Sequence, residues 1–166
     1  MNKFVTAVVL AFSFLCLQAC SSQEEYERKV TETEVPPAVL QAFAKAYPSA
    51  EVRGYAEERE GGKKIYEISF THEGKSMDVT YTVEGELFEV EETIDPADLP
   101  QSAHDEINNK FKDAQIKIAE KVAKSGRLAY EVKIDVQENG ALKRYELVFD
   151  PDGKLLKQEL EREDEE

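Results

Sequence analysis

The segment Tyr66-Glu67-Ile68-Ser69-Phe70 (YEISF) recurs with the same pattern as Tyr130-Glu131-Val132-Lys133-Ile134 (YEVKI) in the second half of the chain. In both segments apolar and polar residues alternate, which is typical of a strand with one buried and one exposed face. The recurrence predicts a duplicated core. In each copy we expect the tyrosine and its second and fourth neighbours to point inward.

Each copy stands in the same order of expected elements. Val35-Pro36 and Leu99-Pro100 place a proline where a helix begins, and apolar residues follow at helical spacing. Residues 77–83 and 145–149 alternate again, and turns such as Asn139-Gly140 separate the runs. We therefore expect an α+β fold made of two tandem α-β-β-β-β repeats, with an antiparallel sheet and the helices packed on one of its faces.

The first residues have the pattern of a bacterial export signal. Lys3 precedes an apolar run, Phe4 to Leu17, that is shorter than the roughly 20 residues needed to cross a bilayer. Leu17-Gln18-Ala19-Cys20 resembles a lipobox, in which cleavage before the cysteine leaves a residue that is acylated. We expect a lipid anchor on Cys20; the alternative is a signal peptide cut nearby that leaves Cys20 unmodified.

These patterns divide the chain into five segments. We expect a signal peptide at 1–19, the lipidated Cys20 with a flexible tether at 20–34, repeats at 35–97 and 98–162, and an acidic tail at 163–166. The residue after the cysteine is Ser21 and not the Asp that signals retention in the inner membrane. The predicted location is therefore the cell envelope, with the protein anchored by lipid; the outer membrane, on its periplasmic or surface face, is favoured over the inner membrane, which is the alternative.

The charge of the chain excludes some classes of partner. A formal net charge of −14 over 166 residues repels nucleic-acid phosphates, so we expect no nucleic-acid partner. The sequence also has no nucleophile motif, phosphate-binding loop or set of residues at metal-ligand spacing. We expect no catalytic residue, no cofactor, no metal and no small-molecule substrate, and hence no enzyme.

The repeated motifs together resemble the PepSY-like family of bacterial envelope proteins. They are Val35-Pro36, Tyr47-Pro48, Tyr66-Glu67-Ile68 and Glu84-Gly85, followed by Leu99-Pro100, Tyr130-Glu131-Val132 and Asp152-Gly153. The resemblance implies a fold like that of the secreted β-lactamase-inhibitor protein, with two tandem units sharing one broad sheet. It also implies a role in binding and in the restraint of peptidases. The inhibitor uses an aromatic-rich sheet face, whereas this chain has no Trp, so lactamase inhibition is not expected.

The outward positions of the expected sheet are the candidate binding residues. They are Glu67, Asp78, Thr80, Glu131, Lys133 and Glu146. Because four of these six are carboxylates, we expect the partner to be an envelope protein with a basic or polar patch. A simply solvated face is the alternative, since antiparallel sheets often leave one side in water.

Two functions remain open at this point. The first is a non-catalytic envelope lipoprotein that acts as a protein-binding module, including inhibition or regulation of a hydrolase or peptidase. The second is a structural or accessory lipoprotein subunit of an envelope complex with no inhibitory role.

Overall fold

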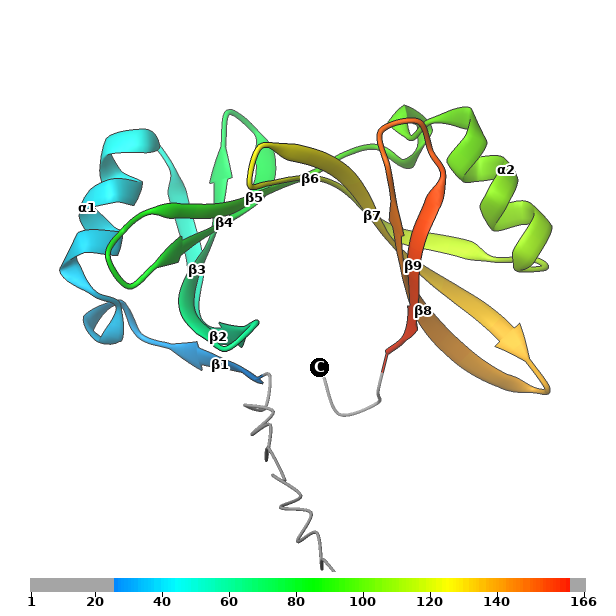
Figure 1. The fold of residues 1–166 in the computed structure, drawn as a ribbon, viewed down its shortest axis with the longest axis horizontal. Helices are drawn as coiled ribbons and strands as arrows, with labels where there is room; N and C mark the ends of the chain where they lie inside the picture. Colours follow the sequence, from blue (N-terminus) through cyan, green and yellow to red (C-terminus); the bar gives the residue numbers. More distant parts are fainter. Residues whose placement is uncertain (1–25, 162–166) are drawn as a thin grey trace, which may run out of the picture.

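The computed structural model describes residues 26–161, which form a single antiparallel sheet and two short α-helices (Figure 1). The first half contains β1 (Tyr26–Val30), the 3-10 turn η1 (Glu32–Glu34), α1 (Pro37–Ala46), β2 (Glu51–Glu60), β3 (Lys63–His72), β4 (Lys75–Thr82) and β5 (Leu87–Thr93). The second half contains η2 (Pro96–Asp98), α2 (Gln101–Lys110), β6 (Gln115–Lys124), β7 (Arg127–Glu138), β8 (Ala141–Phe149) and β9 (Leu155–Leu160). The nine strands lie side by side in sequence order.

The expected α+β fold is wrong, because the protein is mostly β. Nine strands make one continuous sheet, whereas each α-helix is only ten residues long and buries two side chains. The helices therefore do not form a layer packed across one face. Helical spacing in the sequence indicates where a helix forms, but it does not show how little of the sheet such a short helix can cover.

Each half of the molecule has its own apolar cluster. In the first, Val39 and Phe43 of α1 pack with Ile68 and Phe70 of β3, and with Tyr66 at one end. In the second, the packing residues come from α2, from the residues that flank it and from strands β6–β8; they are Leu99, Ala103, Ile107, Phe111, Ala119, Val132, Ile134, Val136, Leu147 and Phe149. The recurring segment thus contributes to one cluster in each half.

The sheet curves into an arch, with β5 and β6 at its top and the two helices outside its opposite ends (Figure 1). An ion pair shows the strength of the curvature. Lys124 at the end of β6 reaches Glu60 at the end of β2 over 2.6 Å, although three strands lie between β2 and β6. We call the inner side of this arch the concave face.

Residues 26–34, assigned above to the tether, form β1 and η1, and β1 pairs antiparallel with β2. Cys20, the signal segment and the tail at 163–166 lie outside the described residues. Among residues 26–161, no helix is both long enough and apolar enough to cross a membrane.

Candidate functional site

The concave face carries one carboxyl side chain from each of six consecutive strands. We call this set the acidic band; its members are Glu58 of β2, Glu67 of β3, Asp78 of β4, Glu91 of β5, Glu120 of β6 and Glu131 of β7. They lie on this face because strand residues alternate and their neighbours, such as Ile68 and Val132, point into the clusters on the other side.

Strand register makes the acidic band continuous. Asp78 lies directly opposite Glu91, and Glu120 lies directly opposite Glu131. Oxygen atoms of Asp78, Glu91 and Glu120 all lie within 4.8 Å of one another. The seam between the two halves, where β5 pairs with β6, therefore runs through the middle of the band.

The floor beneath the acidic band is apolar and closed. Ile65 is 1% exposed and Val122 is 3% exposed, yet neither belongs to the two apolar clusters. Ile65 lies directly opposite Glu58, so it shares the concave face with the band. The band carboxyls are therefore partly removed from water by their own surroundings.

This environment raises the pKa values of the five glutamates of the acidic band. Burial is the largest cause throughout, and neighbouring carboxylates add to it. The pKa rises to about 8 for Glu58, to about 9 for Glu91 and to about 7 for Glu131. The pKa values of Glu67 and Glu120 are raised as well. Near neutral pH the band therefore holds protons that exposed carboxyls would have lost.

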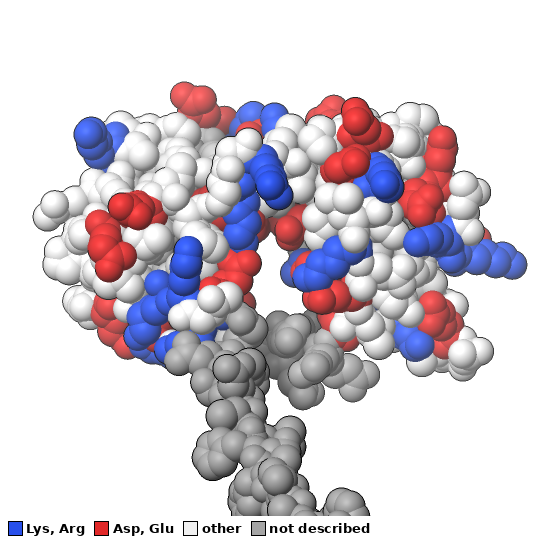
Figure 2. Space-filling view, in the orientation of Figure 1, with Lys and Arg blue, Asp and Glu red and all other residues white. Residues whose placement is uncertain are grey.

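Nearby basic side chains pair with carboxyls outside the acidic band. Lys124 contacts Glu89 at 2.7 Å as well as Glu60. Lys133 contacts Glu161 at 3.3 Å. Within residues 26–161, the band carboxyls form no ion pair, and their polar contacts are with Ser69, Thr93 and one another. Figure 2 shows acidic and basic side chains around the recess between the two halves of the molecule.

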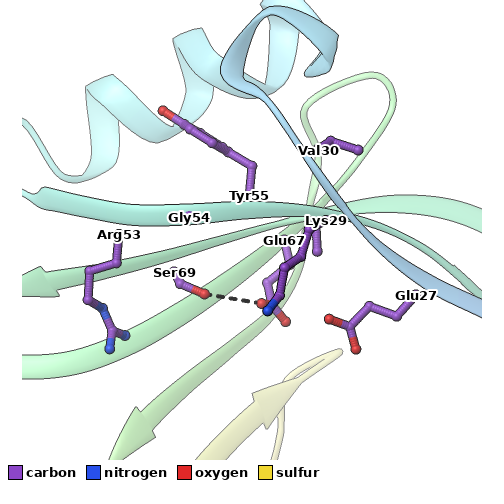
Figure 3. A pocket seen from close by; sticks show the side chains of 9 residues that line it. Glu27, Lys29, Val30, Arg53, Gly54, Tyr55, Glu67 and Ser69 are labelled. Atoms are coloured by element: carbon purple, nitrogen blue, oxygen red, sulfur yellow. Dashed lines mark hydrogen bonds between the residues drawn. The ribbon is translucent and has the colours of Figure 1, made fainter. Parts of the chain in front are cut away.

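A hollow of about 420 Å³ lies at the β1 end of the concave face (Figure 3). It forms because β2 contributes the small residues Gly54 and Ala56, and a Cβ at Gly54 would meet nothing within 4 Å. Its lining mixes both charges; the charged residues are Glu27, Lys29, Arg53 and Glu67. Ser69 donates a hydrogen bond to Glu67 at 3.2 Å.

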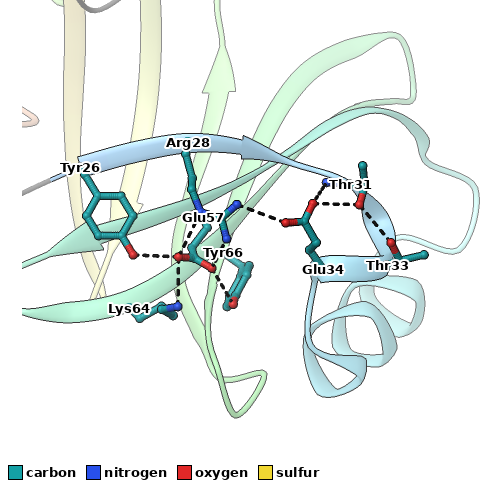
Figure 4. A network of polar contacts seen from close by, with 8 residues as sticks. All are labelled: Tyr26, Arg28, Thr31, Thr33, Glu34, Glu57, Lys64 and Tyr66. Atoms are coloured by element: carbon teal, nitrogen blue, oxygen red, sulfur yellow. Dashed lines mark hydrogen bonds and ion pairs between the residues drawn. The ribbon is translucent and has the colours of Figure 1, made fainter.

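A second polar cluster, centred on Glu57, fastens β1 to the sheet (Figure 4). Glu57 is 4% exposed and accepts hydrogen bonds from Tyr26 at 2.8 Å, Arg28 at 2.9 Å and Tyr66 at 3.0 Å. Lys64 adds an ion pair at 3.0 Å. Burial opposes ionisation of Glu57, but these contacts outweigh it and lower its pKa to about 2. With every partner supplied from within the chain, this cluster is structural.

The predicted binding residues all lie on the concave face, in two groups. Glu67 lies opposite Thr80, which is two residues from Asp78 on β4, and Lys133 lies opposite Glu146. Strands β5 and β6 separate the groups. The residues that join them, Glu91 and Glu120, were not predicted from the sequence. The alternation of Glu89 and Glu91 about Val90 was the available signal for β5.

The acidic band could act in two chemical ways. Carboxylate oxygens are the ligands that Ca²⁺ and Mg²⁺ prefer, so the Asp78, Glu91 and Glu120 group could supply part of a coordination shell. The whole band could instead neutralise several positive charges on a larger partner. None of the band carboxyls is paired with a histidine or a nucleophile in the described part of the chain.

The comparison with family models decides the family. The model described as "Putative beta-lactamase-inhibitor-like, PepSY-like" matches residues 22–89 and 64–157. The chain belongs to this PepSY-like family. The two overlapping matches indicate a repeat, in agreement with the recurrence of the YEISF pattern. The resemblance stated from the sequence is confirmed.

Solved structures from Bacteroides share the fold. A chain described as a putative periplasmic protein of Bacteroides eggerthii DSM 20697 has a TM-score of 0.60 at 22% identity, covering 76% of this chain and 88% of its own. A DUF2874 family protein of Bacteroides uniformis ATCC 8492 has a TM-score of 0.60 at 16% identity, covering 75% and 88%. A BLIP-like protein of Bacteroides fragilis NCTC 9343 has a TM-score of 0.54 at 18% identity, covering 74% and 84%. No curated protein matches the chain.

Proposed function

We propose that this PepSY-like protein is a non-catalytic, lipid-anchored protein of the bacterial envelope that binds another protein through its concave face. The acidic band carries the proposal, because it places unpaired, half-buried carboxyls across six strands of one face. A catalytic site needs a few groups converging on one bond, whereas a row spread over six strands suits an extended contact. The inhibitor-like description of the family supports binding as the activity.

The envelope location draws on two kinds of support. Structural relatives are described as periplasmic proteins, and the Cys20 motif suits export followed by lipidation. Several acyl chains would hold the protein on the membrane, since each buried CH₂ adds about 0.8 kcal/mol of affinity. The residue after Cys20 favours the outer membrane.

Mass spectrometry of the purified N-terminus tests the anchor. We expect the mature chain to begin at an acylated Cys20, and Cys20→Ser to release the protein from membranes. A mature chain that begins elsewhere, or a serine variant that stays equally membrane-bound, would refute lipidation at this residue.

Site-specific photo-crosslinking in intact envelopes tests the binding face. A photoreactive residue at Glu131, on the acidic band, should capture a defined protein. The same residue at Glu73, in the exposed turn between β3 and β4, is the control and should not capture it. Equal capture from both positions, or capture only from outside the concave face, would contradict the proposed surface.

The captured protein then separates the two functional classes. A hydrolase or peptidase whose activity falls when the purified protein is added would make this protein an inhibitor. A stable assembly whose activity does not change would make it an accessory subunit of an envelope complex.

A further inference from the structure

The surroundings of the acidic band do not balance negative charge on it, and this opposes ionisation of its carboxyls. Carboxyls directly opposite one another across two strands repel when both are ionised, as Asp78 with Glu91 and Glu120 with Glu131 do. The nearest lysines pair with other carboxyls, as Lys124 does with Glu60 and Glu89. Added positive charge on this face would relieve the repulsion and stabilise the folded protein.

The extent of the band indicates how that charge is distributed in the partner. Neighbouring strands lie about 4.8 Å apart, so six strands span about 24 Å. One divalent ion takes oxygen ligands only within about 2.6 Å and could neutralise at most the Asp78, Glu91 and Glu120 group. An extended peptide advances about 3.3 Å per residue, so about seven residues would cross the whole band.

The surroundings of the band favour contact with cationic side chains. Ile65 and Val122 are buried beneath the carboxyls and keep their environment apolar, so water screens a charged end that meets a carboxyl there less than it would at an open surface. Thr80, 6% exposed, lies opposite both Glu67 and Glu89, and its hydroxyl makes no hydrogen bond within residues 26–161. Lys29 and Arg53 limit the acidic surface at the β1 end.

We propose that the acidic band docks a polycationic protein segment and that docking displaces protons held by the band. The inference rests on the proposed function and specifies the chemistry of its partner. A segment with several lysine or arginine side chains matches carboxyls placed one per strand, and neutralises both halves of the molecule across the β5–β6 seam.

The proton displacement follows from the electrostatics of the band. In the free protein, burial and like charges raise the pKa of Glu58 to about 8 and that of Glu91 to about 9. Positive charge nearby favours the ionised form of a carboxyl, so docking lowers these pKa values. Docking therefore tightens as pH rises from about 6 to 9, while lysine stays charged below its pKa of about 10.4. Charged groups facing the band from neighbouring strands are Glu27, Lys29, Glu60, Glu89, Lys124, Lys133, Glu146 and Lys157.

Isothermal titration calorimetry of the full protein with octalysine tests the inference. Titration in two buffers with different ionisation enthalpies measures the net number of protons released. We expect about one to two protons released near neutral pH, a matching rise in affinity with pH, and weaker binding as added salt shortens the screening length below about 10 Å. Ca²⁺ and Mg²⁺ are titrated separately.

Two matched variants localise the binding. The face variant combines Glu67→Gln, Glu91→Gln and Glu120→Gln. The control variant removes the same number of carboxyls from exposed positions in turns and loops through Glu73→Gln, Glu84→Gln and Glu86→Gln. We expect the face variant to bind octalysine about tenfold more weakly than the control. Circular dichroism verifies that both variants fold. If the triple face variant does not fold, the single change Glu91→Gln replaces it.

Three results of the titrations would overturn the inference. They are equal octalysine affinity for the two variants, binding without proton release, and tighter binding of Ca²⁺ than of octalysine, which would make the Asp78, Glu91 and Glu120 group a cation site. All three leave the proposed function to its crosslinking test. A crosslinked partner that contacts the band without basic residues would overturn the inference and leave the proposed function standing.

Discussion

Tyr66 and Tyr130 occupy equivalent places in the two repeats, yet their hydroxyl groups have different surroundings. The hydroxyl of Tyr66 donates to the Glu57 carboxylate, whereas that of Tyr130 makes no hydrogen bond within the described residues. Tyr66→Phe should therefore cost about 1.5–3 kcal/mol of unfolding free energy, as hydrogen bonds to charged groups do. Tyr130→Phe, the matched control, should change it by less than about 0.5 kcal/mol. Urea denaturation measures both, and equal losses would contradict the structural role assigned to Glu57.

At the level of single residues, the sequence predicts which way a side chain points but does not predict which residue it contacts. Alternation along one strand predicts that Tyr66 points inward, and the structure places it at 6% exposure. Tyr130, expected to be equally buried, is half-buried. The contact with Glu57 depends on how β1, β2 and β3 are aligned, and the pattern within a single strand does not contain that register.

The strands bend at irregularities that recur in both repeats. Register shifts occur between Val52 and Gly54 in β2 and between Ile116 and Ile118 in β6. At a second pair of shifts the extra residue is Phe88 of β5, opposite Thr80 and Tyr81, and Leu156 of β9, opposite Val148 and Phe149. A bulge bends its strand and increases the local twist, so the four positions account for the curvature of the arch. Sequence alternation alone treats strands as straight, which is why the curvature was not predicted.

The turn between β8 and β9 packs against the start of α2, which gives Gly153 a particular role. Its φ is +79°, and a Cβ there would lie 2.8 Å from the Ala103 backbone nitrogen. Gly140 has a φ of +83° but open space around it, so it is the matched control. Gly140→Ala should cost about 1–2 kcal/mol for the left-handed backbone alone. Gly153→Ala should cost about 1–3 kcal/mol more, because overpacking is added.

Denaturant midpoints of the two glycine variants give this comparison directly. Gly85 stands in the same relation to α1, with a Cβ that would meet the Ala38 carbonyl oxygen at 2.7 Å, so Gly85→Ala should behave like Gly153→Ala. Losses as small as that of Gly140→Ala would show that the turns do not clamp the helices.

The two repeats form one concave face only because β5 and β6 join them. Thr93 of β5 lies opposite Glu120 of β6, which brings oxygens of Glu91 and Glu120 within 4.8 Å of each other, so carboxyls from the first half continue into those of the second. The sequence predicts both sets of outward residues but not their continuity, since that depends on the pairing of strands from different repeats. Duplication thus yields a doubled core on one side of the sheet and an undivided acidic surface on the other.

The acidic band also sets how the stability of the whole molecule depends on pH. Carboxyls whose folded pKa is raised, to about 9 at Glu91 and about 7 at Glu131, stabilise the fold fully below their unfolded pKa of about 4.5. That contribution is lost as pH rises through about 7 to 9. Glu57 acts in the opposite sense, because its pKa of about 2 makes its contribution disappear as pH falls from about 4.5 to 2. Stability should therefore be greatest near about pH 5 and should decline toward about pH 9.

Urea midpoints measured across this range at low salt test the prediction with a pair of variants. Glu91→Gln removes the most strongly shifted carboxyl of the band, so it should flatten the decline above about pH 5 and leave the acid limb unchanged. Glu84→Gln makes the same substitution in an exposed turn and should keep the wild-type slope. Added salt should also reduce the decline in the wild type, because screening weakens repulsion among the band carboxyls that remain in contact with water. A midpoint that rises steadily from about pH 5 to 9 would mean that the band carboxyls are ionised at little cost in the free protein, and that their repulsion does not oppose folding.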